Sequence, residues 1–117
     1  MLIDTNVLSE LLRERPEPKV LAWFAAQPAQ GLFVSSVTQA EMMLGARLLP
    51  AGKRRTLLVQ GLDDMFREDF VGRVLPFDSA AVADYVDIVD TRRRAGRPIS
   101  QFDAQIAAIL HRYELSA

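Results

Sequence analysis

The sequence contains no cysteine and only one histidine, His111. Without cysteine the chain can form neither disulfide bonds nor thiolate zinc sites, and it has no thiol nucleophile. A single imidazole cannot build a histidine-based metal centre, so carboxylates must supply the ligands of any bound metal ion. These absences leave metal ions that prefer oxygen ligands as the candidates for metal chemistry.

The chain also lacks long apolar runs and an excess of charge of one sign. No stretch approaches the ~18 uncharged apolar residues of a membrane span, and the N-terminal Met-Leu-Ile-Asp has no basic signal-peptide region. We therefore expect a soluble cytoplasmic protein with no membrane partner. Fourteen Lys and Arg against fifteen Asp and Glu give a net charge of −1, so nucleic acid could be bound only through local basic groups.

What the chain does contain is the composition of one globular domain over residues 1–117, half of it hydrophobic and a quarter charged. Short apolar runs at 2–3, 32–34 and 73–77 each precede a segment with helical spacing. Strands that alternate with helices predict an α/β fold with a parallel sheet and right-handed crossovers. Residues 114–117 look like the start of a further strand.

Six helices are predicted from apolar side chains that recur at helical spacing and should face the core. These side chains are Val7, Leu8, Leu11 and Leu12; Val20, Leu21 and Phe24; Val37, Ala40, Leu44 and Leu48; Leu58, Leu62, Met65 and Phe66; Val82, Tyr85, Val86 and Val89; and Ile106, Ala107, Leu110 and Tyr113. Asp78 and Ser100 are placed to cap the last two helices. The apolar segments 20–24 and 57–66 are compatible with a surface that binds a partner.

Three acidic residues stand where this fold would bring them together. Asp4 follows the first strand, and ligands bind outside the carboxyl ends of parallel strands. Glu41 and Asp103 lie on the predicted inward faces of their helices, where an unpaired carboxylate would cost on the order of several kcal/mol. Converging carboxylates repel unless a divalent cation lies between them, and oxygen ligands of this kind suit Mg²⁺ or Mn²⁺.

Each acid also has a purely structural interpretation. Asp4 could cap the helix that begins after it. Glu41 fits a capping box that begins at Thr38, and Asp103 fits one that begins at Ser100. We favour one shared site over three separate helix caps.

Four motifs occur in order along nearly the whole chain. They are Ile3-Asp4-Thr5-Asn6, Ser36-Val37-x-x-x-Glu41-x-x-x-Gly45, Leu75-Pro76-Phe77-Asp78 and Gly96-Arg97-Pro98-Ile99-Ser100-x-x-Asp103-Ala104-Gln105-Ile106-Ala107-Ala108. Together they resemble the PIN-domain ribonucleases of the VapC and FitB type, the toxin halves of bacterial toxin–antitoxin pairs. The resemblance implies a three-layer α/β/α sandwich with a short parallel sheet.

The resemblance also implies a site and a reaction. Asp4, Glu41 and Asp103 match the acidic positions that bind metal and catalyse, and Thr5 and Asn6 match the polar residues that support the first acid. The implied activity is Mg²⁺-dependent hydrolysis of phosphodiester bonds in RNA, with Mn²⁺ able to replace Mg²⁺. The implied partners are a cognate antitoxin and a second copy of the chain, in a homodimer or a larger toxin–antitoxin assembly.

The sequence departs from the family pattern near its C-terminal end. Family members usually continue through a further strand and a fourth acid, so the chain looks C-terminally truncated relative to them. A second acid often found two residues before the position of Asp103 is Gln101 here. We therefore expect one strong metal site rather than two.

Arginines at 92, 93, 94 and 97 precede the helix that carries Asp103. Arg92, Arg93, Arg94 and Arg97 could contact RNA phosphates near the site. The alternative is a solvated helix end at which the cations complement the helix dipole.

Two other functions stay open. A catalytically inactive PIN-like domain would serve as an antitoxin-binding module, and its lack of metal affinity would separate it from an enzyme. A phosphoacceptor or phosphatase-like domain would also place an acid after its first strand. Against this, Asn6 stands where a phosphatase needs a second Asp, and neither Lys19 nor Lys53 follows a late strand.

Overall fold

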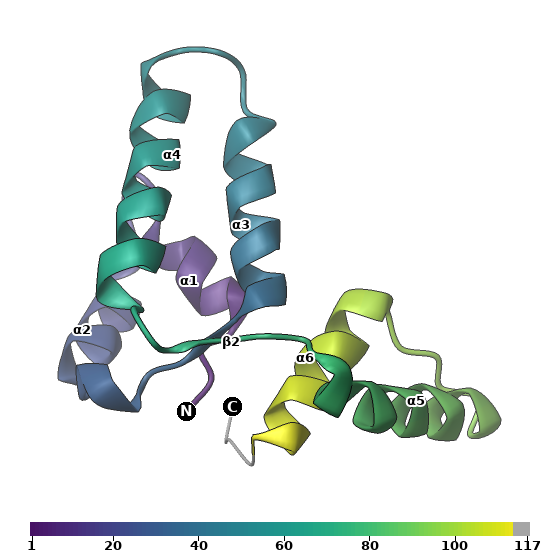
Figure 1. Cartoon of the computed structure of the whole chain (residues 1–117). Coiled ribbons are helices and arrows are strands. Elements are labelled where there is room, and N and C mark those ends of the chain that lie inside the picture. Colours follow the sequence, from purple (N-terminus) through teal and green to yellow (C-terminus); the bar gives the residue numbers. More distant parts are fainter. Residues whose placement is uncertain (114–117) are drawn as a thin grey trace.

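The computed structural model describes residues 1–113, so the strand expected at 114–117 lies outside the described residues. The chain alternates between helices and very short strands (Figure 1). In order, the elements are α1 (Thr5–Leu11), α2 (Pro18–Ala26), the 3-10 turn η1 (Ala29–Gly31), β1 (Val34–Ser35), α3 (Ser36–Arg47), α4 (Lys53–Asp64), the π-helical turn η2 (Met65–Asp69), β2 (Val74–Leu75), α5 (Ser79–Arg94) and α6 (Gln101–Arg112).

A short parallel sheet joins segments that are far apart in the sequence. β1 pairs with β2 in parallel, with Val34 opposite Val74, and a single parallel bridge joins Leu2 to Phe33. The predicted α/β fold with a short parallel sheet is therefore confirmed. The third strand ends before Pro76, earlier than predicted, because proline has no backbone N–H to give to a neighbouring strand.

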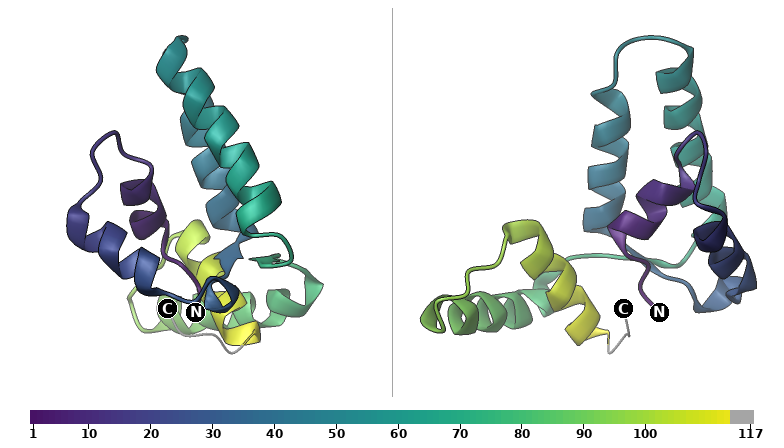
Figure 2. Two further views of the ribbon diagram at one scale, coloured as in Figure 1. Left: turned by 90° about the vertical axis from the view of Figure 1, so that its left-hand side faces the viewer. Right: turned by 180° about the vertical axis from the view of Figure 1, so that it is seen from behind.

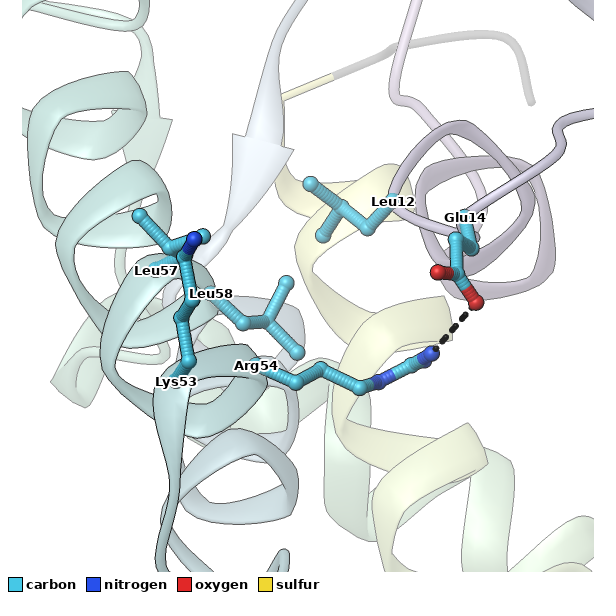
Figure 3. A pocket seen from close by; sticks show the side chains of 6 residues that line it. All are labelled: Leu12, Glu14, Lys53, Arg54, Leu57 and Leu58. Carbon is cyan, nitrogen blue, oxygen red and sulfur yellow. Dashed lines mark hydrogen bonds and ion pairs between the residues drawn. The ribbon is translucent and has the colours of Figure 1, made fainter.

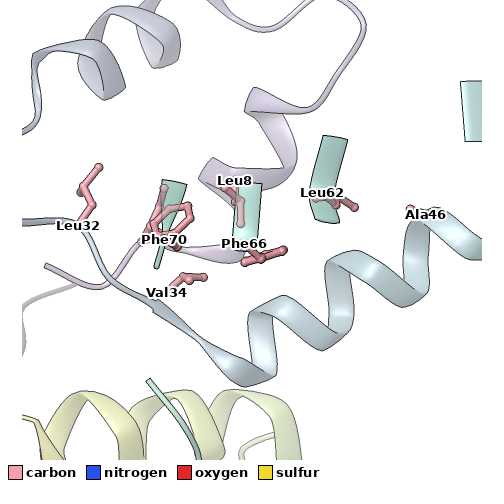
Figure 4. Packing of buried hydrophobic residues seen from close by; sticks show 8 residues of the cluster. Leu8, Leu32, Val34, Ala46, Leu62, Phe66 and Phe70 are labelled. Atoms are coloured by element: carbon pink, nitrogen blue, oxygen red, sulfur yellow. The ribbon is translucent and has the colours of Figure 1, made fainter. Parts of the chain in front are cut away.

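The main apolar core lies between α1, the sheet, α3 and the chain from α4 through η2 (Figure 4). Its side chains are Ile3, Leu8, Leu32, Val34, Ala46, Leu62, Phe66 and Phe70. Leu62 and Phe66 were predicted to face inward and are buried, while Leu58 and Met65 pack at the edge of this cluster. All of the cluster comes from the first seventy residues of the chain.

Two helical hairpins extend from the sheet in different directions (Figures 1 and 2). α3 and α4 form a projecting hairpin, and α5 and α6 form a second one that meets the rest of the protein through contacts of α6 with α3. Asp78 and Ser100 cap α5 and α6 as predicted. Within residues 1–113, no helix combines the length and the apolar character needed to cross a membrane.

The predicted inward face of α3 is wrong beyond Val37. Leu44 and Leu48 are 60% and 74% exposed, whereas Ala46 is buried in the core cluster. α3 carries apolar side chains on more than one face, and the face with Ala46 is the one that α4 and the core cover. Hydrophobic spacing alone could not decide between these faces.

The predicted inward face of α5 is also partly wrong. Val82 and Val86 are 45% and 54% exposed, because α5 packs mainly against α6 and its other sides have little cover. Tyr85 packs edge-on against Phe77, with ring centroids 5.5 Å apart. Tyr113, predicted to be inward on α6, is exposed as well.

Candidate functional site

A cavity of about 250 Å³ opens where the start of α1, the middle of α3 and the start of α6 meet. Its lining residues are Leu2, Ile3, Asp4, Thr5, Asn6, Glu41, Asp103, Ile106 and Leu110. The cavity thus brings together the three acids and the two polar residues that the sequence singled out. Their roles in binding and catalysis stay predictions.

Asp4 is held at the edge of the sheet by its neighbours. The backbone N–H of Ile3 donates to the carbonyl of Phe33 at 2.7 Å, which fixes the strand immediately before the acid. Asp4 is the N-cap of α1, and its Oδ1 accepts a hydrogen bond of 2.6 Å from the backbone N–H of Asn6. The capping interpretation is therefore correct for Asp4, and the same side chain also lines the cavity.

Glu41 lies half-buried on α3, and the alternative interpretation of Glu41 as part of a capping box is wrong. The N-cap of α3 is Ser35, whose Oγ accepts a 2.9 Å hydrogen bond from the backbone N–H of Thr38. Within the described chain the Glu41 carboxylate makes no hydrogen bond and no ion pair. It has no capping function that would explain its position beside the cavity.

Asp103 lies in the first turn of α6, and its carboxylate is exposed instead of facing inward as predicted. Ser100 caps the helix by accepting a hydrogen bond of 3.1 Å from the backbone N–H of Asp103. This is one half of the expected capping box, since the carboxylate of Asp103 does not bond back to Ser100. The exposed turn leaves that carboxylate on the wall of the cavity.

The charge of the cavity is uncompensated. Across residues 1–113, none of these three carboxylates pairs with a lysine, arginine or histidine. In the same residues, no three Asp, Glu, His or Cys side chains lie close enough together to hold one metal ion directly. Carboxylate oxygens are the donors that Mg²⁺ takes in proteins, usually one or two at a time with water in its other positions.

Two buried hydroxyl groups lie near the cavity, and the sequence analysis named one of them, Thr38, only as the possible start of a capping box. Ser35 and Thr38 are 0% and 1% exposed, and Thr38 lies within 2.9 Å of the Thr5 hydroxyl. The spacing Ser-x-x-Thr at the start of a helix predicts a cap. It does not predict a contact with Thr5, which is thirty-three residues away.

The four arginines gather at the end of α5 and in the loop that follows it. Arg94 pairs with Asp90 at 2.9 Å, and Arg92 Nε donates to the carbonyl of Arg97 at 2.7 Å. None of the four lines the acidic cavity. Part of this group therefore stabilises its own helix end, and contact with RNA stays a prediction.

Two further cavities adjoin the end of α1. One, of about 460 Å³, lies beside α4 and is crossed by an ion pair of 3.5 Å between Arg54 and Glu14 (Figure 3). The other, of about 570 Å³, is mostly apolar and is lined from α1, α2 and η2. Leu12 lines both cavities, so they adjoin each other. They include parts of both apolar segments that were expected to bind a partner.

Comparison with known proteins gives consistent matches. The model of the PIN-domain family matches residues 1–117. The chain is 41% identical over 108 residues to VapC ribonuclease Y4jK of Sinorhizobium fredii, covering 92% of this chain and 77% of that protein. It is 36% identical over 116 residues to toxin FitB of Neisseria gonorrhoeae, and the match covers 99% of this chain and 84% of that protein. The crystal structure of FitAcB from Neisseria gonorrhoeae superposes with a TM-score of 0.90 at 37% identity. The superposition covers 97% of this chain and 82% of the chain in that structure.

Proposed function

This chain belongs to the PIN-domain family, and we propose that it is a Mg²⁺-dependent endoribonuclease, the toxin of a toxin–antitoxin pair. The observation that carries the proposal is the cavity into which Asp4, Glu41 and Asp103 bring three carboxylates without a cationic partner among residues 1–113. The similarity to a protein named a ribonuclease and to another named a toxin supports the same assignment.

In this proposal, Asp4 and Asp103 hold the cation and Glu41 either joins them or acts as a base. When bound, Mg²⁺ would supply positive charge at a phosphodiester oxygen and make a nearby water more acidic. The cap hydrogen bond from Asn6 orients Asp4. Glu41 has no capping bond to break, so its carboxylate is free to accept a proton from the attacking water.

The test is cleavage of an end-labelled structured RNA in Mg²⁺ or Mn²⁺, compared with the same reaction in EDTA. Asp4→Asn and Asp103→Asn should abolish cleavage and leave folding nearly unchanged, because asparagine keeps the shape and a cap acceptor. Asp87→Asn is the matched control, since Asp87 is an exposed acid on α5, outside the cavity and away from the four arginines' ion pairs. Activity at the wild-type level in either cavity variant would remove that residue from the mechanism.

The second candidate function is a catalytically inactive PIN-like module that binds an antitoxin. It is favoured by one observation, that no three described acids lie close enough to ligate a single ion directly. Titration of the purified chain with Mn²⁺ separates the two functions. An enzyme should bind the ion and lose that binding in Asp4→Asn, whereas an inactive module should bind a partner protein but no ion.

We further propose that the antitoxin binds along the two cavities beside the end of α1. The larger one is lined mainly by apolar side chains of α1, α2 and η2. Apolar walls of this kind fit a partner segment that presents apolar side chains.

For a second copy of the chain, we propose two other exposed apolar patches. Leu44 and Leu48 lie at the end of α3, Val82 and Val86 lie on α5, and all four are outside both of those cavities. Leu48→Asp should convert a dimer to a monomer in sedimentation and leave antitoxin copurification intact. Leu21→Asp, in the apolar cavity, should have the opposite pair of effects. If both variants behave as wild type in both assays, these surfaces are not interfaces.

A further inference from the structure

Behind the acidic cavity lies a chain of three hydroxyl groups that joins two separate elements. The Thr38 backbone N–H donates to Ser35 Oγ at 2.9 Å, and Ser35 Oγ donates to Thr38 Oγ1 at 3.0 Å. Thr38 Oγ1 in turn lies 2.9 Å from Thr5 Oγ1. Among the described residues, Ser35 and Thr38 are the polar side chains that are fully buried.

The direction of the hydrogen bonds follows from the hydrogen count. A hydroxyl group has one hydrogen to donate and two lone pairs to accept with. Ser35 already gives its hydrogen to Thr38, so Thr38 must give its own hydrogen elsewhere. Apart from Ser35, the hydroxyl within reach of buried Thr38 is that of Thr5, and a buried donor seldom goes without an acceptor. The chain therefore runs from Ser35 through Thr38 to Thr5.

With this direction of hydrogen bonding, the Thr5 hydroxyl keeps its own hydrogen available to donate. Thr5 lines the acidic cavity, whereas Ser35 and Thr38 do not. Thr5 directly follows Asp4, and Thr38 lies three residues before Glu41 on the same helix, which makes these two neighbours on its surface. The hydroxyl chain thus links the segment that carries one acid to the segment that carries another. The other polar link between α1 and α3 is a weaker bond from Ser9 to the sulfur of Met42.

We propose that Ser35 and Thr38 are positioning residues of the acidic cavity. They act through Thr5, set the separation of the Asp4 and Glu41 carboxylates, and present the remaining hydroxyl hydrogen of Thr5 to an anionic oxygen in the cavity. The importance of that separation for catalysis rests on the proposed ribonuclease function. The geometric link between the two segments does not depend on it.

The first test compares Thr38→Val, which removes the hydroxyl but keeps the shape, with Thr38→Ser, which keeps the hydroxyl. A displacement of about 1 Å at a reacting group can lower a rate about 100-fold. Thr38→Val should therefore lower kcat by about 10-fold to 100-fold, change KM by less than about threefold, and weaken Mn²⁺ binding. Thr38→Ser should stay within about twofold of wild type. Equal kcat and equal Mn²⁺ affinity in all three proteins would overturn the proposal.

The second test uses Thr5→Val, because Thr5 is only partly buried and its replacement leaves the buried pair in place. If Thr38 acts through Thr5, the double variant Thr5→Val/Thr38→Val should bind Mn²⁺ no more weakly than Thr5→Val alone. Effects that add in full would show that the two residues act independently, which overturns the proposal. Melting curves recorded for each variant separate a loss of positioning from a loss of folding.

A readout without metal or RNA separates this inference from the proposed function. In the metal-free protein, Thr38→Val should shift the backbone amide resonances of Asp4, Thr5 and Asn6, and Thr38→Ser should leave them near their wild-type positions. If wild type cleaves no RNA but these shifts occur, the proposed function fails and the positioning role stands. Unchanged resonances at residues 4–6 would contradict the positioning role whatever the activity.

Discussion

Residues 1–75 and the α5–α6 hairpin bury different kinds of side chain. The first region surrounds a core of leucine, phenylalanine and valine, in which Leu8, Val34 and Leu62 are at most 1% exposed. The hairpin buries mainly alanine, at positions 81, 104 and 108, together with Ile109. Alanine lets helices approach closely but removes little apolar surface from water, so most of the hydrophobic stabilisation belongs to the first region.

The acidic cavity depends on both regions at once. Asp4 and Glu41 are carried by the strongly packed region, and Asp103 is carried by the hairpin. The position of Asp103 relative to the other acids is therefore set by the contact of α6 with α3. The comparison teaches that the stability of this protein and the completeness of its candidate site rest on different contacts.

The largest effect on stability is expected in the first region. Leu62→Ala should lower the free energy of unfolding by about 2–5 kcal/mol, because it leaves a cavity in a fully buried cluster. Urea denaturation measures this change. Leu57→Ala on the same helix is the control, and it should change stability by less than about 0.5 kcal/mol because Leu57 is 58% exposed. Similar losses in both variants would contradict the assignment of the core.

A smaller loss of stability but a larger loss of function is expected in the hairpin. Ala108→Leu should destabilise by about 1–3 kcal/mol, because a larger side chain must be accommodated at a fully buried position. It should also weaken Mn²⁺ binding and RNA cleavage, since the overpacked α6 moves Asp103. Ala83→Leu, at an exposed position of α5, should change neither. Wild-type metal binding in Ala108→Leu would show that the docking of α6 does not set the site.

The smallest effects concern pH, and they should have opposite signs in the two regions. In the first region, a hydrogen bond from Arg13 holds the pKa of Glu10 below its ordinary value, and a bond from the Glu17 backbone N–H acts in the same direction. A pKa that folding lowers gives stability that is present above the ordinary value of 4.5 and is lost as the pH falls further.

In the hairpin, partial desolvation, the negative charge of Asp78 and a hydrogen bond to it all raise the pKa of Tyr113. A pKa that folding raises gives stability that is present below the ordinary value of 10.0 and is lost as the pH rises further. Glu10→Gln should therefore flatten the acid limb of a stability profile, and Tyr113→Phe the alkaline limb. Urea unfolding between pH 3 and pH 11 provides both measurements. If the free energy of unfolding of each variant depends on pH in the same way as that of wild type, Glu10 and Tyr113 do not cause the pH dependence.

Much of the fold could be predicted from local signals. The order of strands and helices, the caps at Asp78 and Ser100, and the inward face of α4 all follow from the chemistry of neighbouring residues. The placement of Asp4 beside the cavity followed from the rule that parallel strands present their carboxyl ends at one edge. Glu41 and Asp103 also line the cavity, although the inward helix faces from which they were predicted are only partly correct. The alternative interpretation of Glu41 as part of a capping box was wrong, because Ser35, one residue before the helix, supplies the cap.

The sequence by itself determined the kind of fold and the family, and it supplied the prediction of three site acids, because periodicity, helix caps and motif spacing are properties of neighbouring residues. Only the tertiary structure decided which apolar face of α3 is covered, and that Val82 and Val86 stay exposed on α5. It alone placed the hydroxyl of Thr38 against that of Thr5. Such contacts join residues far apart in the chain and depend on how whole helices pack against one another. The spacing of neighbouring residues therefore does not predict them.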